Sequence, residues 1–245
     1  MNHRDLSKAA LCGEPSFIWR AGQERRLKMI LDRAGDLVHG HVLENGCGVG
    51  LYMERLASYK GNVVGLEYDF PRAVKARDHS KNIINAAGEN LPLKDKTFDL
   101  VLSHEVIEHM QNDKAGIVEM IRILKSGGRI IIFCPNRGYP FETHGIFWRG
   151  KYKFGNIPLV NWLPRKWRDS IAPHVNVYSK TDLISLLENL PVVILYHSII
   201  FGAYDNLIAR SSFLGKAIRS ILQYLEHTPL KVFGLSHFLV LEKKN

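Results

Sequence analysis

The stretch VLENGCGVG at residues 42–50 constrains the fold of this chain more than any other segment. Its first residues are apolar, as the end of a buried strand requires, and glycines follow at alternate positions, Gly46, Gly48 and Gly50. Glycine adopts positive φ at low cost and lets the backbone approach a ligand closely. A strand that ends in such a turn is typical of nucleotide-binding α/β proteins, although an ordinary strand-to-helix turn shares the pattern.

Short apolar runs recur along the chain and alternate with segments long enough for helices. They cover residues 42–45, 63–68, 98–103 and 129–135, with a weaker run at 82–87. This alternation predicts an α/β fold of the doubly wound, Rossmann-like kind, with a mostly parallel sheet and helices on both faces. Two later runs, at 192–200 and 236–244, are expected to form a closing antiparallel pair.

Helical periodicity predicts flanking helices at residues 19–37, 179–190 and 205–227, the last of which includes Arg210. A further helix that contains Ile117 and Leu124 is expected to end at residues 125–128, where a glycine supplies a left-handed cap. Residues 136–178 are rich in Pro, Gly, aromatic and basic residues and lack sustained periodicity. We expect this segment to form a lid or substrate loop.

The length and composition predict one large α/β domain rather than several. The chain has 245 residues, of which 46% are hydrophobic, and no apolar run reaches the length of a membrane span or of a signal-peptide centre. We therefore expect a cytoplasmic protein, and the three cysteines, Cys12, Cys47 and Cys134, are expected to be reduced thiols. The expected parts are a helical segment (1–40), a cofactor-binding core (41–135), the lid (136–178) and the C-terminal helices and closing strands (179–245).

The formal charge of +9 arises from 33 Lys and Arg against 24 Asp and Glu. Such a balance is compatible with an anionic partner such as nucleic acid, a phospholipid surface or a phosphorylated substrate. A merely solvated basic surface explains it equally well.

An acidic residue at the end of the second strand of a doubly wound sheet can accept hydrogen bonds from ribose hydroxyls. Glu67 ends the run VVGLE about 20 residues after the glycine turn, as the nucleotide-binding pattern requires. Asp69 competes for this role. The alternative for Glu67 is a surface acid that caps the next helix.

Four ordered motifs, VLENGCGVG, VVGLEYD, GENLPLKDKTFDLVLSHEVIEH and LKSGGRIIIFCPN, resemble the class I S-adenosylmethionine-dependent methyltransferases of type 11 over roughly residues 40–136. The resemblance implies a seven-stranded sheet with an antiparallel last strand and S-adenosyl-L-methionine as cofactor. The positions that it assigns to the cofactor site are Glu44, Asn45, Gly46, Cys47, Gly48, Gly50, Glu67, Tyr68, Ala87, Gly88, Glu89, Ser103 and His104.

The resemblance implies that these residues contact different parts of the cofactor. The residues of the first loop would line its methionine and ribose portions, Glu67 would bind the ribose, and Ser103 and His104 would flank the sulfonium. One position departs from the family pattern, because Ala87 stands where an acid commonly accepts a hydrogen bond from the adenine amino group. Backbone groups around Ala87 and Gly88 are then expected to serve adenine.

The segment HEVIEHM directly follows the apolar run at residues 98–103. On a helix, Glu105, Glu108 and His109 of this segment would share one face. Two carboxylates and an imidazole suit a divalent metal (Mg, Mn or Zn), with His174 as a fourth ligand from the lid. This pattern resembles two metal-dependent branches of the family, the ubiquinone-type O-methyltransferases and the small-RNA 3′-end 2′-O-methyltransferases. Without a metal, His109 is the expected general base, and Glu105 is the second catalytic candidate.

The lid mixes aromatic and basic side chains, and its segment 141–168 suits three partners. It could stack on bases and grip phosphates, lie with the 205–227 helix against a membrane, or close over a small-molecule pocket. His144 could be a hydrogen-bonding residue of the lid or a ligand. The sequence favours O-methylation of a small or lipid-linked metabolite. RNA 2′-O-methylation and a non-catalytic basic module that binds membrane or nucleic acid are the alternatives.

Overall fold

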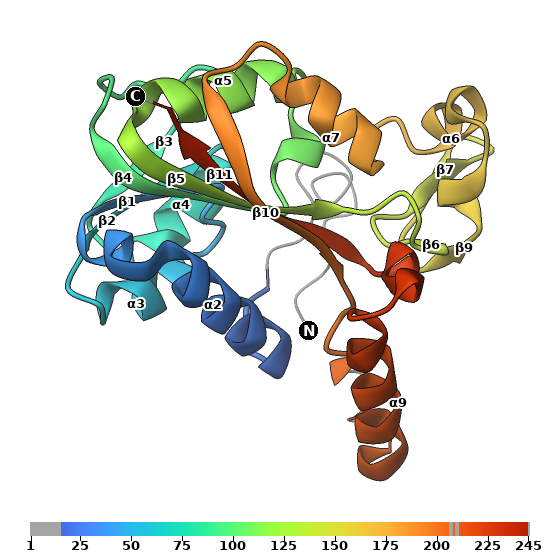
Figure 1. The fold of residues 1–245 in the computed structure, drawn as a ribbon. Coiled ribbons are helices and arrows are strands. Elements are labelled where there is room, and N and C mark those ends of the chain that lie inside the picture. The colour runs from blue at the N-terminus through green and yellow to red at the C-terminus, as the bar shows by residue number, and fades with distance from the viewer. Residues whose placement is uncertain (1–15, 206–207, 209–210, 245) are drawn as a thin grey trace.

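The computed structural model describes residues 16–205, 208 and 211–244, and a seven-stranded sheet forms its centre (Figure 1). The strand order is β10-β11-β5-β4-β1-β2-β3. The bounds are β1 His41–Asn45, β2 Asn62–Glu67, β3 Ile83–Asn85, β4 Phe98–His104, β5 Leu124–Pro135, β10 Val192–Ile200 and β11 Ser236–Lys243. Strands β1 to β5 pair in parallel, and β11 runs antiparallel to both β5 and β10. The predicted fold class is confirmed, including the antiparallel last strand.

Helices cover both faces of this sheet, with α2 and α3 on one side and α5 and α7 on the other (Figure 1). Their bounds are α2 Ala21–Ala34, α3 Leu51–Ala57, α4 Phe70–Ala76, α5 Asp113–Ile123, α7 Lys180–Leu187 and α9 Ser212–Leu225. Side chains alternate between the faces along β5: Ile130 and Ile132 pack toward α5, whereas Ile131 and Phe133 pack toward α2. Both faces are apolar, as a sheet buried on both sides requires.

The prediction that a glycine at residues 125–128 caps the end of α5 is wrong. The helix ends at Ile123, and Leu124 is already extended, with φ −72° and ψ 143°, so that Gly127 with its positive φ of 74° lies within β5. The backbone N–H groups of Lys96 and Thr97 donate to the carbonyls of Arg122 and Ile123, at 3.2 and 2.7 Å. A strand-to-strand turn therefore satisfies the last carbonyls of the helix, and no glycine is needed there.

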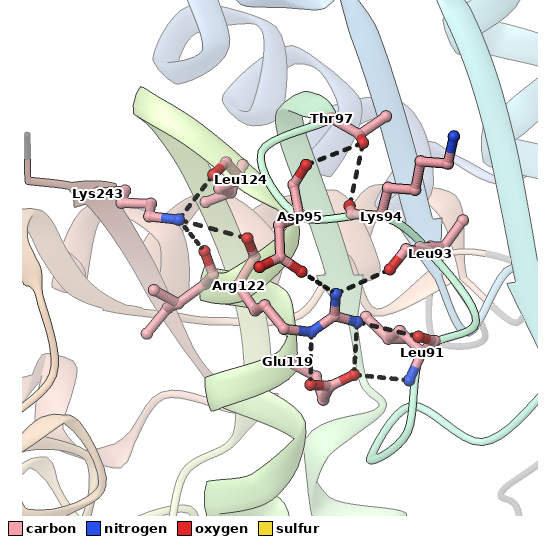
Figure 2. A network of polar contacts seen from close by, with 10 residues as sticks. Leu91, Leu93, Lys94, Asp95, Thr97, Glu119, Arg122, Leu124 and Lys243 are labelled. Carbon is pink, nitrogen blue, oxygen red and sulfur yellow. Dashed lines mark hydrogen bonds and ion pairs between the residues drawn. The ribbon is translucent and has the colours of Figure 1, made fainter.

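Arg122 near the end of α5 holds the loop between β3 and β4 in place (Figure 2). Its guanidinium donates to the carbonyl oxygens of Leu91 (3.0 Å) and Leu93 (2.8 Å) and to the carboxylate of Asp95 (2.5 Å). Glu119, one turn earlier, accepts two further bonds from it, each 2.8 Å. The N–H of Leu91 in turn donates to Glu119 at 2.8 Å, so both side chains help to fix the loop that carries residues 87–89 to α5.

Residues 136–178 contain more regular structure than the sequence predicts. Two small antiparallel sheets form, one from β6 (Phe141–Glu142) and β9 (Ile157–Pro158), the other from β7 (Ile146–Trp148) and β8 (Lys151–Lys153). The 3₁₀ turn η3 (Val160–Trp162) and the helix α6 (Arg165–Ile171) complete the segment, which lies beyond α7 in Figure 1. A buried ion pair of 2.8 Å joins Arg168 to Glu142 within it.

The predicted helices at 19–37 and 179–190 are confirmed as α2 and α7, and α9 occupies most of the range 205–227. Cys12 and Arg210 lie outside the described residues. Cys47 and Cys134 are buried and not in disulfides. None of the helices in the described part of the chain is both long and apolar enough to cross a bilayer.

Candidate active site

The glycine turn after β1 has the conformation that its sequence predicts. Gly46, Gly48 and Gly50 have φ values of 77°, 58° and 88°, all in the left-handed region. A Cβ on Gly46 would also collide with the side chain of Val106. The N–H groups of Gly46 and Cys47 donate to the carbonyl of Leu66 on β2, at 2.8 and 2.9 Å, so the turn is tied to the neighbouring strand.

Glu67 ends β2 directly beside this turn. Its carboxylate accepts hydrogen bonds from the backbone N–H of Gly48 and of Asp69, each 2.8 Å. Asp69, not Glu67, is the N-cap of α4, because it accepts from the N–H of Arg72 at 3.0 Å. Burial raises the pKa of Glu67. The carboxylate retains lone pairs for a ligand, since two hydrogen bonds do not exhaust them.

Several polar side-chain atoms near the turn are buried. Within the described residues, hydrogen-bond partners are absent for Glu44 Oε2, both amide atoms of Asn45 and Ser103 Oγ. Buried polar atoms in native proteins are almost always paired. These unpaired atoms, which come from the ends of the adjacent strands β1 and β4, therefore fit a site that a polar ligand completes. Burial and the neighbouring Glu67 raise the pKa of Glu44 well above its usual value.

The remaining residues of the expected cofactor site differ in burial and in their contacts. Gly88 is buried, and a Cβ there would collide with Met110 and lie 3.1 Å from Asn45 Oδ1. Glu89 accepts from the N–H of Gln111 at 2.9 Å. Tyr68 is exposed at the end of β2, whereas Cys47 is buried, and burial raises the pKa of its thiol. Close backbone approach at Gly88 agrees with the expectation that backbone groups serve adenine, which stays a prediction.

Arg26 of α2 meets the carboxyl end of β4, a contact that sequence reasoning missed. It donates to Glu105 Oε1 and to Ser236 Oγ, each at 3.0 Å, and contacts the ring of His104. Burial and the Arg26 charge lower the pKa of His104 to about 3. A cavity of about 270 Å³ opens beside His104 and Arg26. No sequence signal could have linked Arg26 to Glu105, since 79 positions separate them.

The prediction that Glu105, Glu108 and His109 share one face of a helix is wrong. Glu105 has a positive φ of 56°, and only the 3₁₀ turn η2 (Ile107–His109) follows. Glu105 is bound to Arg26 and Ser236, and this contact lowers its pKa to about 2. Glu108 is 1% exposed, and neither of its oxygens meets hydrogen-bond geometry with any described residue. Burial and the nearby Glu105 raise its pKa well above the usual value.

The sequence predicts Glu105 beside Glu108 and His109, whereas in the structure His144 completes the group of three. One ligand atom each from Glu108, His109 and His144 lie within 4.8 Å of one another. The carboxylate of Glu142 accepts from the backbone N–H of His144 at 2.8 Å and lies 3.2 Å from its Nδ1. His174 is a neighbour that shares ring contacts with Phe147 and Tyr152. Burial, together with the other imidazoles, lowers the pKa of His109 to about 3.

Comparisons with known proteins agree with this geometry. The family model described as a methyltransferase domain matches residues 43–132. The ubiquinone biosynthesis O-methyltransferase of Photobacterium profundum is 25% identical over 210 residues, which make up 83% of this chain and 83% of that protein. A "Probable S-adenosylmethionine-dependent methyltransferase" of Mycolicibacterium smegmatis is 34% identical over 116 residues, 46% of this chain and 45% of that protein. An S-adenosylmethionine-dependent methyltransferase structure from Mesorhizobium loti matches with a TM-score of 0.62 at 15% identity, over 91% of this chain and 98% of that chain.

The strand order, the glycine turn and the acid that ends β2 agree with the class I methyltransferase fold, in which ligands bind at the carboxyl ends of the strands. Residues 43–132 thus match a methyltransferase domain, and over most of its length the chain is similar to a methyltransferase. S-adenosylmethionine is the methyl donor that this family implies.

Proposed function

We propose that this enzyme transfers the methyl group of S-adenosylmethionine to a hydroxyl oxygen of a small or lipid-linked metabolite. The observation that carries the proposal is the cluster of the buried Glu108 with the half-buried His109 and His144 beside the end of β4. The O-methyltransferase named above, similar over most of both chains, supports the same choice of acceptor atom. Residues 1–245 would form one domain for this reaction.

The cofactor contacts follow from the unpaired atoms under the glycine turn. Glu67 would accept hydrogen bonds from the ribose hydroxyls, and Glu44, Asn45 and Ser103 would face the methionine portion. Backbone groups at Gly88 would serve adenine. His104, a neutral imidazole because of its low pKa of about 3, would stand beside the sulfonium without repelling its positive charge.

In the reaction, the acceptor oxygen attacks the methyl carbon in line, the carbon–sulfur bond breaks and S-adenosylhomocysteine leaves. The hydroxyl proton must go to a base. His109 is neutral at physiological pH and can accept it, but an imidazole with a pKa of about 3 provides little driving force at neutral pH. Positioning of the two reactants therefore contributes most of the rate enhancement.

The same cluster fits a divalent cation. One carboxyl and two imidazoles favour Mn or Zn over Mg, and the unpaired oxygens of the buried Glu108 are the donors that such an ion requires. Glu108, His109 and His144 would hold the ion, with His174 beside them. A bound cation supplies Lewis acidity that lowers the pKa of a coordinated hydroxyl. Glu105 would then position Arg26 and His104 rather than bind the metal.

RNA 2′-O-methylation is the second candidate, because Trp148 and Trp167 are exposed next to Arg149 and Lys166 and could stack on bases. The similarity to methyltransferases favours either enzyme over a non-catalytic module.

Two measurements test the proposal. Calorimetry of the full chain should show binding of S-adenosylmethionine, and Glu67→Gln should weaken it, whereas Glu54→Gln on the exposed part of α3 should not. Methyl-labelled cofactor should then pass its label to a hydroxyl in a small-molecule or lipid extract. Absence of S-adenosylmethionine binding would contradict the proposed enzymatic activity. Label found only in RNA would show that the methyl acceptor is RNA and not a metabolite.

A further inference from the structure

The helix α9 extends away from the sheet (Figure 1). It also exposes a stripe of apolar side chains. Phe213, Ile221 and Tyr224 are 87%, 61% and 70% exposed, and Leu214 is 57% exposed. Residues at i, i+8 and i+11 of a helix share one face, so these side chains form a single stripe with Ala217 between them. Exposure of neighbouring large apolar side chains in water is unfavourable by roughly 25 cal/mol per Å², and it marks an interaction site.

The charge of α9 is entirely positive. The segment 212–225 contains Lys216 and Arg219 and no acidic residue, and Lys231 follows in the 3₁₀ turn η4 (Pro229–Phe233). An apolar stripe flanked by basic residues is typical of helices that lie in the headgroup region of an anionic membrane. A symmetric pair of copies joined through this stripe would bring the same basic residues together without an acid on α9 to balance them.

The exposed apolar surface continues beyond the end of α9. Leu230, Val232 and Phe233 of η4 are all exposed, and the ring of Trp162, also exposed, lies 6.0 Å from that of Phe233. Tryptophan is enriched where membranes meet water, because its ring is amphipathic. We call the exposed residues of α9 and η4, together with Trp162, the α9 surface.

An apolar cavity of about 320 Å³ lies at the C-terminal end of α9. Its walls include Phe141, Phe201, Leu222, Leu225, Leu230 and Phe233. Water needs polar partners to occupy a cavity, whereas an apolar cavity accepts hydrocarbon. Phe201 also lines the cavity beside His104, so it stands between this apolar space and the proposed methyl-transfer site.

The base of α9 is fixed to the rest of the enzyme at this point. Glu226, which follows the helix, accepts from Arg25 at 2.6 Å and from the backbone N–H of Phe201 at 2.8 Å. Arg25 also donates to the carbonyl of Phe201 at 3.0 Å. The α9 surface therefore has a fixed attachment beside the active-site cavity.

We propose that the α9 surface docks on an anionic lipid bilayer, and that the cavity at its base receives the hydrocarbon chain of a lipid-borne methyl acceptor. The docking is independent of the chemistry, whereas the assignment of the chain to the acceptor rests on the proposed methyl transfer. The bilayer provides both the apolar layer that the stripe needs and the negative charge that Lys216 and Arg219 need.

Flotation with lipid vesicles tests the docking. The full chain should float with vesicles of phosphatidylcholine mixed with phosphatidylglycerol, less with phosphatidylcholine alone, and less at high salt. The double variant Phe213→Ser/Ile221→Ser should lower the partition coefficient by about tenfold or more, given the transfer energy of two large apolar side chains. Ile184→Ser, a matched exposed position on α7, should leave it unchanged.

Other outcomes overturn the docking. Wild-type protein that stays with the soluble fraction contradicts it, as does equal flotation of the double variant. If sedimentation shows a dimer that the double variant dissociates, the occupant of the α9 surface is a second copy. Cofactor binding by calorimetry, unchanged in both variants, shows that the enzyme is folded and separates these failures from a failure of the proposed function.

The cavity has its own test. Leu225→Trp, which fills it, should keep cofactor binding and vesicle flotation but reduce label transfer to acceptors in a lipid extract. Transfer to short-chain, water-soluble acceptors should persist in this variant. Unchanged transfer to lipid acceptors contradicts the assignment of the cavity.

Discussion

Arg122 donates from Nε and Nη2 to the two carboxylate oxygens of Glu119, each at 2.8 Å, so the two side chains form a bidentate pair one turn apart on α5. The same guanidinium grips three groups of the loop between β3 and β4 (Figure 2). That loop carries residues 87–89 of the proposed adenine site. We therefore expect this pair to influence cofactor binding.

Replacement of Arg122 should therefore affect both stability and the cofactor. Arg122→Met removes five hydrogen bonds and leaves two carbonyls short of a donor, which should cost about 2–3 kcal/mol of unfolding free energy. We also expect weaker S-adenosylmethionine binding, because the loop loosens. Urea unfolding and calorimetry measure the two effects. Lys114→Met, an exposed change on the same helix, is the control, and equal behaviour of both variants would contradict the coupling.

The stabilisation by Glu119 should depend on pH. Hydrogen bonds from Arg122 lower the pKa of Glu119, so its contribution is fully present above the unfolded pKa of about 4.3 and is lost as pH falls through the folded value. The loss of stability in Glu119→Gln should thus be larger at pH 7 than at about pH 3, since below the unfolded pKa the unfolded wild-type chain gains a proton and part of the stabilisation is lost. Urea titrations at both pH values test this, and a pH-independent difference would be against it.

Gly46→Ala should abolish the cofactor cradle. The residue has φ 77°, and a Cβ would collide with Val106, so backbone strain and steric overlap act together. We expect S-adenosylmethionine affinity to fall by about tenfold or more, together with a stability loss of about 1–3 kcal/mol. Gly127→Ala is a matched control, because its φ of 74° is also positive but nothing lies within 4 Å of the added Cβ. It should lose stability alone. If both variants lost S-adenosylmethionine affinity to a similar extent, the cause would be general unfolding and not the local change at Gly46.

Metal binding distinguishes His144 from Glu105. Mn²⁺ titrated into the protein and followed by electron paramagnetic resonance should bind wild type and Glu105→Gln alike. Glu108→Gln and His144→Ala should each weaken binding by about tenfold or more, as expected for lost ligands. If Glu105→Gln loses binding and His144→Ala retains it, the helical arrangement predicted from the sequence would be restored. If wild type binds no Mn²⁺, the metal proposal fails and His109 remains the base.

The prediction from sequence succeeded where local patterns carry the information. The strands of the parallel sheet, the turn at Gly46 to Gly50 and the position of Glu67 follow from short apolar runs, glycine spacing and distance along the chain. These features depend on residues close in sequence, whose conformations the backbone geometry limits.

Long-range contacts decided the rest. The sequence by itself determined the fold class and the conformation of the glycine turn, because alternation of buried strands and helices permits few topologies and glycine spacing limits the backbone of the turn. Only the tertiary structure decided which side chains meet at the acceptor end. Arg26 forms an ion pair with Glu105, and Glu142, itself paired with the buried Arg168, binds the backbone of His144 next to His109. The turn at Lys96 replaced the glycine cap of α5. A buried charge or carbonyl takes whichever partner the packed chain brings near, and local sequence does not encode that choice.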